Sequence, residues 1–435
     1  MQLEKTQYLL QSISSGKIFE DQGWSLDAPE ETTPTLVRAV YEKKQISVKD
    51  DEYGIYKFAD WLPVNRMLKG SSAPVTYQSR GLAKQLGLTN LWITFSGYWP
   101  EIGAGMQTCS FKETEAYSVC ARFDPGSGKV LVVASAGNTA RAFAKVCSDN
   151  RIPLLLCVPE DTLDALWFEH PLNDCVRLVA TAKGSDYFDA IRLSNIAASM
   201  DGFIAEGGAK NVARRDGMGT TLLSAATAIG RIPDYYFQAV GSGTGSIAAW
   251  EANLRLIEDG RFGNNKMKLM VSQNSPFTPI YDAWEKGSRN LLTMDDDIAR
   301  KQVNVIDAKV LSNRKPPYPP AGGLYDALSD TGGKVLKVIN QEARMAAQII
   351  RETEGIDIHP AAAVAVASLM EEVKKTSFPK DAVIMLNITG GGEEHFRNKK
   401  QLYYLKPSLI FDVTCPEEEV KDKIIGLFLV PVFKS

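Results

Sequence analysis

The 435-residue sequence is poor in metal-binding and cross-linking side chains. It has only three histidines, at 170, 359 and 395, and six cysteines without a C-x-x-C pair among them. Structural and catalytic zinc sites need closely spaced cysteine or histidine ligands, so we expect no metal site. Six scattered cysteines are also more typical of reduced, buried thiols than of a disulfide framework, which favours a cytoplasmic protein.

An excess of charge of one sign and long apolar runs are lacking as well. Lysine and arginine together number 49 and aspartate and glutamate 52, which gives a formal charge of -3. The chain therefore has no basic excess for nucleic acid and no polybasic patch for a membrane surface. No apolar run approaches a membrane span, and the first residues lack the pattern of a signal peptide. We expect a soluble protein whose partners are small molecules.

The hydrophobic pattern predicts the α/β fold class. From about residue 130 onward, short apolar runs alternate with amphipathic stretches, as in KVLVVAS followed by NTARAFAKVCSDN. Runs that are apolar throughout indicate strands buried on both faces of a parallel sheet, and the stretches between them indicate covering helices. A second unit of this kind begins near residue 235. We expect two parallel-sheet lobes with a ligand cleft between them.

Two segments outside these runs are predicted to be helical. The stretch TLVRAVYEKKQ at 35–45 predicts a short helix, and KVLKVINQEARMAAQIIRETEG at 334–355 predicts a longer one. The expected organisation of the whole chain is a β/α extension over 1–50, a large lobe over 51–129 and 236–410, a small lobe over 130–235 and a C-terminal segment over 411–435.

Two glycine-containing turns each follow a predicted strand and precede a predicted helix. In GSGTGS, at 241–246, the backbone N–H groups of the turn can converge on an anion, which suits a phosphate. As a dinucleotide fingerprint this turn is imperfect, because Ser246 stands where the third glycine belongs. A simple tight turn is an equal alternative. The other turn, ASAGNTARAF at 134–143, contains Asn138 and Thr139, although either could serve only as a helix cap.

Two further motifs contain polar or reactive side chains. NITGGGEEH, at 387–395, ends a predicted strand at Thr389, and its three glycines would let a ligand ring approach the backbone. CSFKETEA, at 109–116, carries Lys112 at the start of a predicted helix. A lysine on a helix is usually solvated, so this residue becomes a catalytic candidate only together with the other motifs.

Taken in order, S-F-K, S-x-G-N-T, the glycine-rich turn and the late Thr-Gly-Gly resemble the fold-type II pyridoxal-phosphate enzymes over roughly residues 50 to 400. The resemblance implies that Lys112 forms the Schiff base with the cofactor and that Asn138 bonds its phenolic oxygen. It also implies that Thr389 faces the pyridine nitrogen, where a hydroxyl favours elimination and replacement over transamination. The cofactor phosphate is then assigned to Gly241, Ser242, Gly243, Thr244 and Gly245.

Within this group the chain resembles the threonine synthase-like enzymes, through GIYKFADWLPV, KNVARRDGMGTT and EGIDIHPAAAVAVASL. Asn211 and Arg214 fall where these enzymes keep an asparagine and an arginine that binds the substrate phosphate. Lys210 is expected beside them, and Arg215 on a solvated helix face. The resemblance also implies that the substrate carboxylate is received by Ser135, Ala136, Gly137 and Thr139.

The chain departs from the usual pattern of these enzymes at Gly208 and Ala209, which replace Asn-Ser, and in YWPEIGAGMQTC before the S-F-K motif. The departures are similar to a branch that makes L-cysteate from O-phospho-L-serine and sulfite on the way to coenzyme M. The alternatives are a threonine synthase acting on O-phosphohomoserine, an NAD-binding oxidoreductase using GSGTGS, and a non-catalytic paralogue, which the intact Lys112 argues against. As in most of the family, a homo-oligomer is expected.

Overall fold

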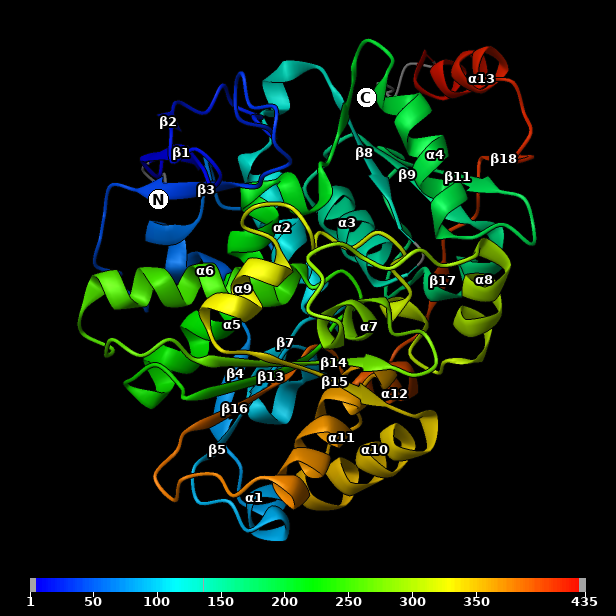
Figure 1. Ribbon diagram of the computed structural model, residues 1–435. Coiled ribbons are helices and arrows are strands. Elements are labelled where there is room, and N and C mark those ends of the chain that lie inside the picture. The colour runs from blue at the N-terminus through cyan, green and yellow to red at the C-terminus, as the bar shows by residue number, and fades with distance from the viewer. Residues whose placement is uncertain (1–4, 136, 430–435) are drawn as a thin grey trace.

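The computed structural model describes residues 5–135 and 137–429, and two β-sheets form its centre (Figure 1). The strands of the larger sheet are Val75–Gln78 (β4), Leu91–Phe95 (β5), Tyr235–Ala239 (β13), Lys268–Asn274 (β14), Lys334–Val338 (β15) and Ile384–Ile388 (β16). The strands of the smaller sheet are Val130–Ala134 (β8), Leu154–Pro159 (β9), Val176–Thr181 (β11), Phe203–Ala205 (β12) and Leu409–Phe411 (β18).

Both sheets are built from parallel neighbours. The larger sheet has the order β15-β14-β13-β16-β5-β4, in which only β4 runs antiparallel to its neighbour. The smaller sheet, in the order β12-β8-β9-β11-β18, is parallel throughout. Every residue of β9 and β16 is buried, as expected for strands covered on both faces. The predicted α/β class with parallel sheets is confirmed.

Helices cover both faces of the larger sheet (Figure 1). Val212–Ile229 (α5) and Thr244–Asp259 (α6) lie on one face, and Asn340–Glu354 (α10) and Pro360–Lys375 (α11) lie on the other. Neighbouring residues of β13 point to opposite faces, so Tyr236 packs in the core with α5 and α6, whereas Phe237 packs with α10 and α11. The helices are Gly81–Leu86 (α1), Lys112–Arg122 (α2), Asn138–Asp149 (α3), Tyr187–Ala198 (α4), Val212–Ile229 (α5), Thr244–Asp259 (α6), Pro279–Glu285 (α7), Asp296–Val305 (α8), Leu324–Asp330 (α9), Asn340–Glu354 (α10), Pro360–Lys375 (α11), Glu393–Lys399 (α12) and Glu417–Leu429 (α13).

The N-terminal segment forms a small antiparallel sheet of Tyr8–Ser12 (β1), Ile18–Phe19 (β2) and Val37–Tyr41 (β3). The helix predicted over 35–45 is therefore wrong. Burial in VRAVY alternates with a period of two, so that Val37 and every second residue after it enter the core shared with α5 and α6. Two further two-stranded pairs are Tyr98–Trp99 (β6) with Ala104–Gly105 (β7), and Trp167–Phe168 (β10) with Tyr403–Tyr404 (β17).

The long helix predicted over 334–355 is correct only from Asn340 onward. KVLKV forms β15 at the edge of the larger sheet, and α10 begins after Ile339, whose N–H donates to Oε2 of Glu342 at 2.9 Å. Five residues are too few to distinguish a strand period from a helix period, and pairing with β14 decides for the strand.

The boundaries between the two expected lobes stay a prediction. Two segments of the chain pack against elements of the other lobe than the one to which the sequence assigned them. Residues 409–411 pair with β11 of the smaller sheet, although the sequence grouped them mainly with the large lobe. Helix α5 packs in the core of α6 and the larger sheet, although it follows β12 of the smaller sheet. Within residues 5–135 and 137–429, no helix has both the length and the apolar character needed to cross a membrane.

Candidate active site

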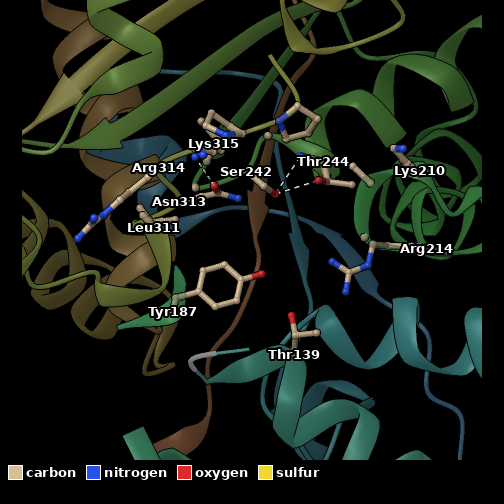
Figure 2. A pocket seen from close by; sticks show the side chains of 18 of the residues that line it. Thr139, Tyr187, Lys210, Arg214, Ser242, Thr244, Leu311, Asn313, Arg314 and Lys315 are labelled. Atoms are coloured by element: carbon tan, nitrogen blue, oxygen red, sulfur yellow. Dashed lines mark hydrogen bonds between the residues drawn. The ribbon is translucent and has the colours of Figure 1, made fainter. Parts of the chain in front are cut away.

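A cavity of about 1370 Å³ opens at the carboxyl ends of β8, β13 and β16, the position at which parallel α/β sheets usually bind ligands (Figure 2). The residues after these three strands are three of the motifs singled out in the sequence. The cavity lining contains Lys112, Ser135, Gly137, Asn138, Thr139, Lys210, Arg214, Gly241, Ser242, Gly243, Thr244, Gly245 and Thr389. Ala136, the remaining member of its motif, lies outside the described residues.

Lys112 is the first residue of α2, and its side chain is only 20% exposed. Its Nζ lies 4.7 Å from the ring centroid of Phe111, 3.0 Å from Oε2 of Glu115 and 3.8 Å from Sδ of Met218. The backbone N–H of Phe111 donates to the carbonyl of Thr389 at 2.9 Å, which joins the start of α2 to the end of β16. Lys112 is therefore a partly buried amine in the cavity wall and not a solvated surface lysine.

The glycine-rich turn at 241–245 is closely packed at its glycines. A Cβ atom on Gly241 would lie 2.9 Å from Cα of Leu311, and one on Gly245 would lie 2.9 Å from Cε2 of Phe111. Helix α6 begins at Thr244, whose N–H donates to Oγ of Ser242 at 3.3 Å (Figure 2). The first N–H groups of a helix have no partner within the helix, so this turn offers donors to an anion in the cavity.

The turn between β8 and α3 presents hydroxyl groups to the cavity. Oγ of Ser135 accepts a hydrogen bond from the N–H of Gly137 at 3.2 Å, which closes the turn. Oγ1 of Thr139 donates to Oε1 of Glu115 at 3.2 Å, which ties the turn to α2. The Thr139 hydroxyl already donates to Glu115, so the donors that this turn offers to a carboxylate are the hydroxyl of Ser135 and the backbone N–H groups at the start of α3.

Asn138 is oriented by a buried arginine. Its Oδ1 accepts from Nη2 of Arg141 at 3.0 Å, and Arg141 also donates to the carbonyl of Thr108 and lies 4.1 Å from the ring centroid of Trp167. Because the amide oxygen is engaged by Arg141, the NH₂ group of Asn138 is the end that remains as a donor.

Arg214 is held in place by two buried carboxylates. Its Nε lies 2.8 Å from Oε1 of Glu206, and its Nη2 lies 3.3 Å from Oε1 of Glu115. Burial acts against the charge of Arg214, but these two carboxylates outweigh it and raise the pKa of the guanidinium. Burial likewise raises the pKa of the Glu206 carboxyl, against the opposing effect of Arg214. The guanidinium reaches into the cavity with this orientation in Figure 2.

Lys210 lies at the cavity as the sequence suggested, whereas Asn211 does not. Lys210 lines the cavity from its rim, with its Nζ 2.7 Å from a carboxylate oxygen of Asp27. Asn211 is not among the lining residues. It caps α5, its Oδ1 accepting from the N–H of Ala213 at 3.1 Å and from Nη1 of Arg122 at 2.8 Å. The structure therefore does not bring Asn211 to the cavity.

The expectation of a solvated Arg215 is wrong. Its side chain is fully buried, with Nε 2.9 Å from Oε2 of Glu251 and the two Nη atoms bonded to the carbonyls of Ala209 and Val37. Helix α5 packs against α2, α6 and β3, so a side chain on the face away from the cavity is covered as well.

Several cavity residues were not identified in the sequence. His359 caps α11 through its Nδ1, which accepts from the N–H of Ala361 at 3.1 Å, and burial lowers its pKa to about 4. Tyr187, at the start of α4, extends its hydroxyl into the cavity (Figure 2). Only the His-Pro pair before an alanine-rich helix was a local signal, and it indicates a helix start, not a ligand site.

The proline-rich chain from 309 to 321 forms one wall of the cavity, beside the glycine-rich turn (Figure 2). Nη2 of Arg314 lies 2.5 Å from Oδ2 of Asp186, which precedes α4, so this wall is joined to the smaller sheet's helices. Nothing in the sequence of this proline-rich segment indicates that it approaches a site.

Comparison with known proteins identifies the family. Residues 76–390 match the family described as pyridoxal-phosphate dependent enzyme. The chain belongs to this family. It is therefore an enzyme with pyridoxal phosphate as its cofactor, and the predictions of the family and of the cofactor are confirmed.

Curated proteins are similar to this pyridoxal-phosphate enzyme over most of its length. A protein named cysteate synthase from Methanosarcina acetivorans is 46% identical over 393 residues, 90% of this chain and 94% of its own. A cysteate synthase from Methanocella paludicola is 48% identical over 376 residues, 86% of this chain and 88% of its own.

Solved structures show the same fold at low identity. Maize serine racemase has a TM-score of 0.54 at 14% identity, with 73% of this chain and 88% of that chain covered. Threonine deaminase isoform 2 from Solanum lycopersicum has a TM-score of 0.53 at 16% identity, with 75% and 86% covered. The predicted fold-type II architecture is confirmed.

The residues that line the cavity fit the cofactor of this family. An amine beside an aromatic ring is present at Lys112, as an aldehyde-bearing cofactor requires. The glycine-rich turn has N–H groups and two hydroxyls for a phosphate, in a place where any side chain on Gly241 would intrude on the backbone of Leu311. Thr389 and Asn138 also line the cavity, and their side chains supply polar groups for the ring of the cofactor.

Proposed function

We propose that this enzyme is a cysteate synthase. It would exchange the phosphate of O-phospho-L-serine for sulfite, breaking a Cβ–O bond and forming a Cβ–S bond, to give L-cysteate and phosphate. The observation that carries the proposal is the identity of 46% and 48% to proteins of that name over most of both chains. A role of the product in coenzyme M biosynthesis is part of the same proposal.

The cofactor site that we propose uses the three strand ends around the cavity. Lys112 would be the attachment point, and the N–H groups and hydroxyls of 241–245 would bind the cofactor phosphate. The NH₂ group of Asn138 would donate to the phenolic oxygen, and the hydroxyl of Thr389 would face the ring nitrogen. When bound, pyridoxal phosphate supplies an electron sink that stabilises negative charge at Cα of an attached amino acid.

The substrate would lie between the start of α3 and α5. Ser135, Gly137 and Thr139 would receive its carboxylate, and Ala136 is proposed with them. Lys112 would remove the Cα proton at Nζ, hold it while phosphate leaves Cβ and sulfite adds there, and then return it. Nζ must be a neutral amine when it takes the proton, and it is the resulting ammonium that returns the proton.

Arg214 would hold the leaving phosphate. Its Nε and Nη2 are engaged by Glu206 and Glu115, so Nη1 is the group that remains for the substrate. The two carboxylates fix the plane of the guanidinium in advance, which lowers the ordering cost of binding a phosphate. Lys210 at the rim would assist. For Asn211 we propose only a structural role, as the cap of the helix that carries Arg214.

The test is a product analysis with the purified enzyme. Incubation with phosphoserine and sulfite should yield cysteate, and phosphoserine alone should yield pyruvate slowly, identified by mass. Threonine from O-phosphohomoserine, with no turnover of phosphoserine, would establish the threonine synthase alternative instead. Membership of the pyridoxal-phosphate family leaves no support for the dinucleotide alternative.

The proposal includes the oligomeric state and the cellular compartment of the enzyme. We expect a homo-oligomer, which light scattering coupled to size exclusion would measure as a multiple of the 47.7 kDa chain. We also expect a cytoplasmic enzyme, and the six free cysteines suit a reducing compartment.

A further inference from the structure

An amide side chain lies inside the larger sheet, on a strand that is otherwise apolar or aromatic. Gln238 belongs to β13, and only 2% of the residue is exposed. It also lines the cavity, next to the turn that is assigned to the cofactor phosphate. An amide that is buried without hydrogen bonds is costly, so both ends of this side chain need partners. The function proposed above gives Gln238 no role.

The oxygen of the Gln238 side chain has its partners inside the protein. Residues two apart on a strand point to the same face, and the hydroxyl of Tyr236 donates to Oε1 of Gln238. Nδ2 of Asn387, on the neighbouring strand β16, donates to the same oxygen at 3.0 Å and to the hydroxyl oxygen of Tyr236 at 2.7 Å. Two donors therefore hold Oε1 and fix the orientation of the amide.

The nitrogen of this side chain has no such partner. Within residues 5–135 and 137–429, Nε2 of Gln238 makes no hydrogen bond, and it is the end that remains for the cavity. A Cβ atom on Gly245 would lie 2.7 Å from this nitrogen and 2.9 Å from Cε2 of Phe111. The NH₂ group is thus next to the first turn of α6, where the glycine-rich turn ends.

The turn at 241–245 uses part of its hydrogen-bonding capacity internally. The hydroxyls of Ser242 and Thr244 are bonded to each other at 2.9 Å, and the N–H of Thr244 donates to Oγ of Ser242 (Figure 2). None of the five side chains in the turn is charged. A phosphate group has three strong acceptor oxygens and up to two negative charges, so it can accept a further donor from outside the turn.

We propose that the NH₂ group of Gln238 donates a hydrogen bond to the phosphate of the cofactor. Tyr236 and Asn387 are positioning residues, because they hold Oε1 and thereby direct Nε2 to the cavity. The inference rests on the proposed assignment of the cofactor phosphate to residues 241–245. It gives a reason for an amide in a buried strand, where an apolar side chain would need no partners.

The test measures the binding of two probes to the apoenzyme by fluorescence titration: pyridoxal phosphate, and pyridoxal, which lacks the phosphate. Gln238→Met keeps the length of the side chain and removes the donor. Loss of one hydrogen bond to a charged group should raise Kd for pyridoxal phosphate by about 10- to 100-fold. Kd for pyridoxal should stay within about threefold of wild type, because this probe has no phosphate to lose the bond.

Gln273→Met is the matched control. Gln273 lies on β14 and is fully buried, and its Oε1 accepts from the N–H groups of Ile280 and Tyr281 at 2.8 and 3.0 Å. Its Nε2 also lacks a partner among the residues that the structure describes, but Gln273 is not part of the cavity lining. Both methionine variants leave two donors unpaired, and thermal unfolding measures the loss of stability in each. Gln273→Met should change Kd for either probe by less than about threefold.

Gln238→Glu keeps an oxygen for Tyr236 and Asn387, so it tests the donor even if Gln238→Met does not fold. Its second oxygen replaces the NH₂ group and places like charge beside the phosphate, which opposes binding. Kd for pyridoxal phosphate should rise by at least about 10-fold, and Kd for pyridoxal should rise much less.

The inference is overturned if both Gln238 variants keep Kd for pyridoxal phosphate within threefold of wild type, or if they lose as much affinity for pyridoxal. Gly241→Ala in the same titrations then separates the two possible errors. If Gly241→Ala binds pyridoxal phosphate more weakly, the phosphate assignment stands and only the role of Gln238 fails. If it binds as tightly as wild type, the assignment of the phosphate to residues 241–245 fails as well.

Discussion

Replacing Arg214 by lysine should impair turnover of phosphoserine far more than the same replacement at Arg215, the next residue on α5. Both arginines are paired with buried carboxylates, but Arg214 lines the cavity and Arg215 does not. A lysine keeps the positive charge and loses the fork of donors. At 214 its single nitrogen can pair with Glu206 or Glu115, and no N–H then remains in place for the phosphate.

The expected magnitude follows from the contacts. One charge-assisted hydrogen bond to the leaving phosphate is worth about 1.5 to 3 kcal/mol. At 1.4 kcal/mol for each tenfold change, Arg214→Lys should lower kcat/KM by about 10- to 150-fold. Arg215→Lys loses bonds to the carbonyls of Ala209 and Val37, which should cost about 1 to 3 kcal/mol of stability but leave kcat/KM within about threefold.

The assay is phosphate release from phosphoserine over a range of concentrations at saturating sulfite, with thermal unfolding and bound cofactor measured in the same preparations. Cofactor content should be unchanged in both variants, because neither residue contacts the glycine-rich turn at 241–245. Equal losses of kcat/KM at the two positions, or an Arg214→Lys enzyme within threefold of wild type, would show that Arg214 does not hold the phosphate.

Three further outcomes test the site and its surroundings. The purified enzyme should absorb in the visible, and borohydride should fix its cofactor to the Lys112 peptide, whereas Lys112→Ala should yield no labelled peptide; label on a different lysine would refute the assignment. Gly241→Ala puts a Cβ 2.9 Å from Cα of Leu311 and should weaken pyridoxal-phosphate binding by about 1 to 3 kcal/mol in a fluorescence titration, and unchanged affinity would contradict this packing. Burial lowers the pKa of His359 to about 4, so the unfolded chain takes up this proton first and stability falls as pH drops from about 6.5 to 4. His359→Gln has no histidine to titrate at this position, so its free energy of unfolding should not show this loss. Urea unfolding should show that the free energy of unfolding of the variant, relative to wild type, rises by about 2 kcal/mol between pH 7 and pH 4.5. A difference that stays constant with pH would contradict the buried, neutral state of His359.

The sequence alone was sufficient for features that depend on local chemistry. Uniformly apolar runs such as LLLCVP can be stable only inside a covered sheet, and glycines after a strand indicate a turn that admits a ligand. The resemblance carried by the order of the motifs also placed Lys112, the turn after β8, the turn at 241–245 and Thr389 at one site, and all of them line the cavity. The turns after β13 and β16 meet because the carboxyl ends of parallel strands lie at one edge of a sheet, whereas the turn after β8 belongs to the smaller sheet and reaches the cavity through the packing of the two sheets.

Only the tertiary structure decided how the charged side chains are paired and which ambiguous segments become strands. Val37–Tyr41 and Lys334–Val338 are strands because partners elsewhere in the chain accept their hydrogen bonds, and five-residue patterns do not specify a partner. Arg214 and Arg215 are neighbours in the sequence, yet one meets Glu115 and the cavity while the other meets Glu251 in the core. The direction of each side chain depends on how α5 packs between α2 and α6. A buried guanidinium is stable only when it is paired, and here each pairs with a carboxylate from a distant part of the chain.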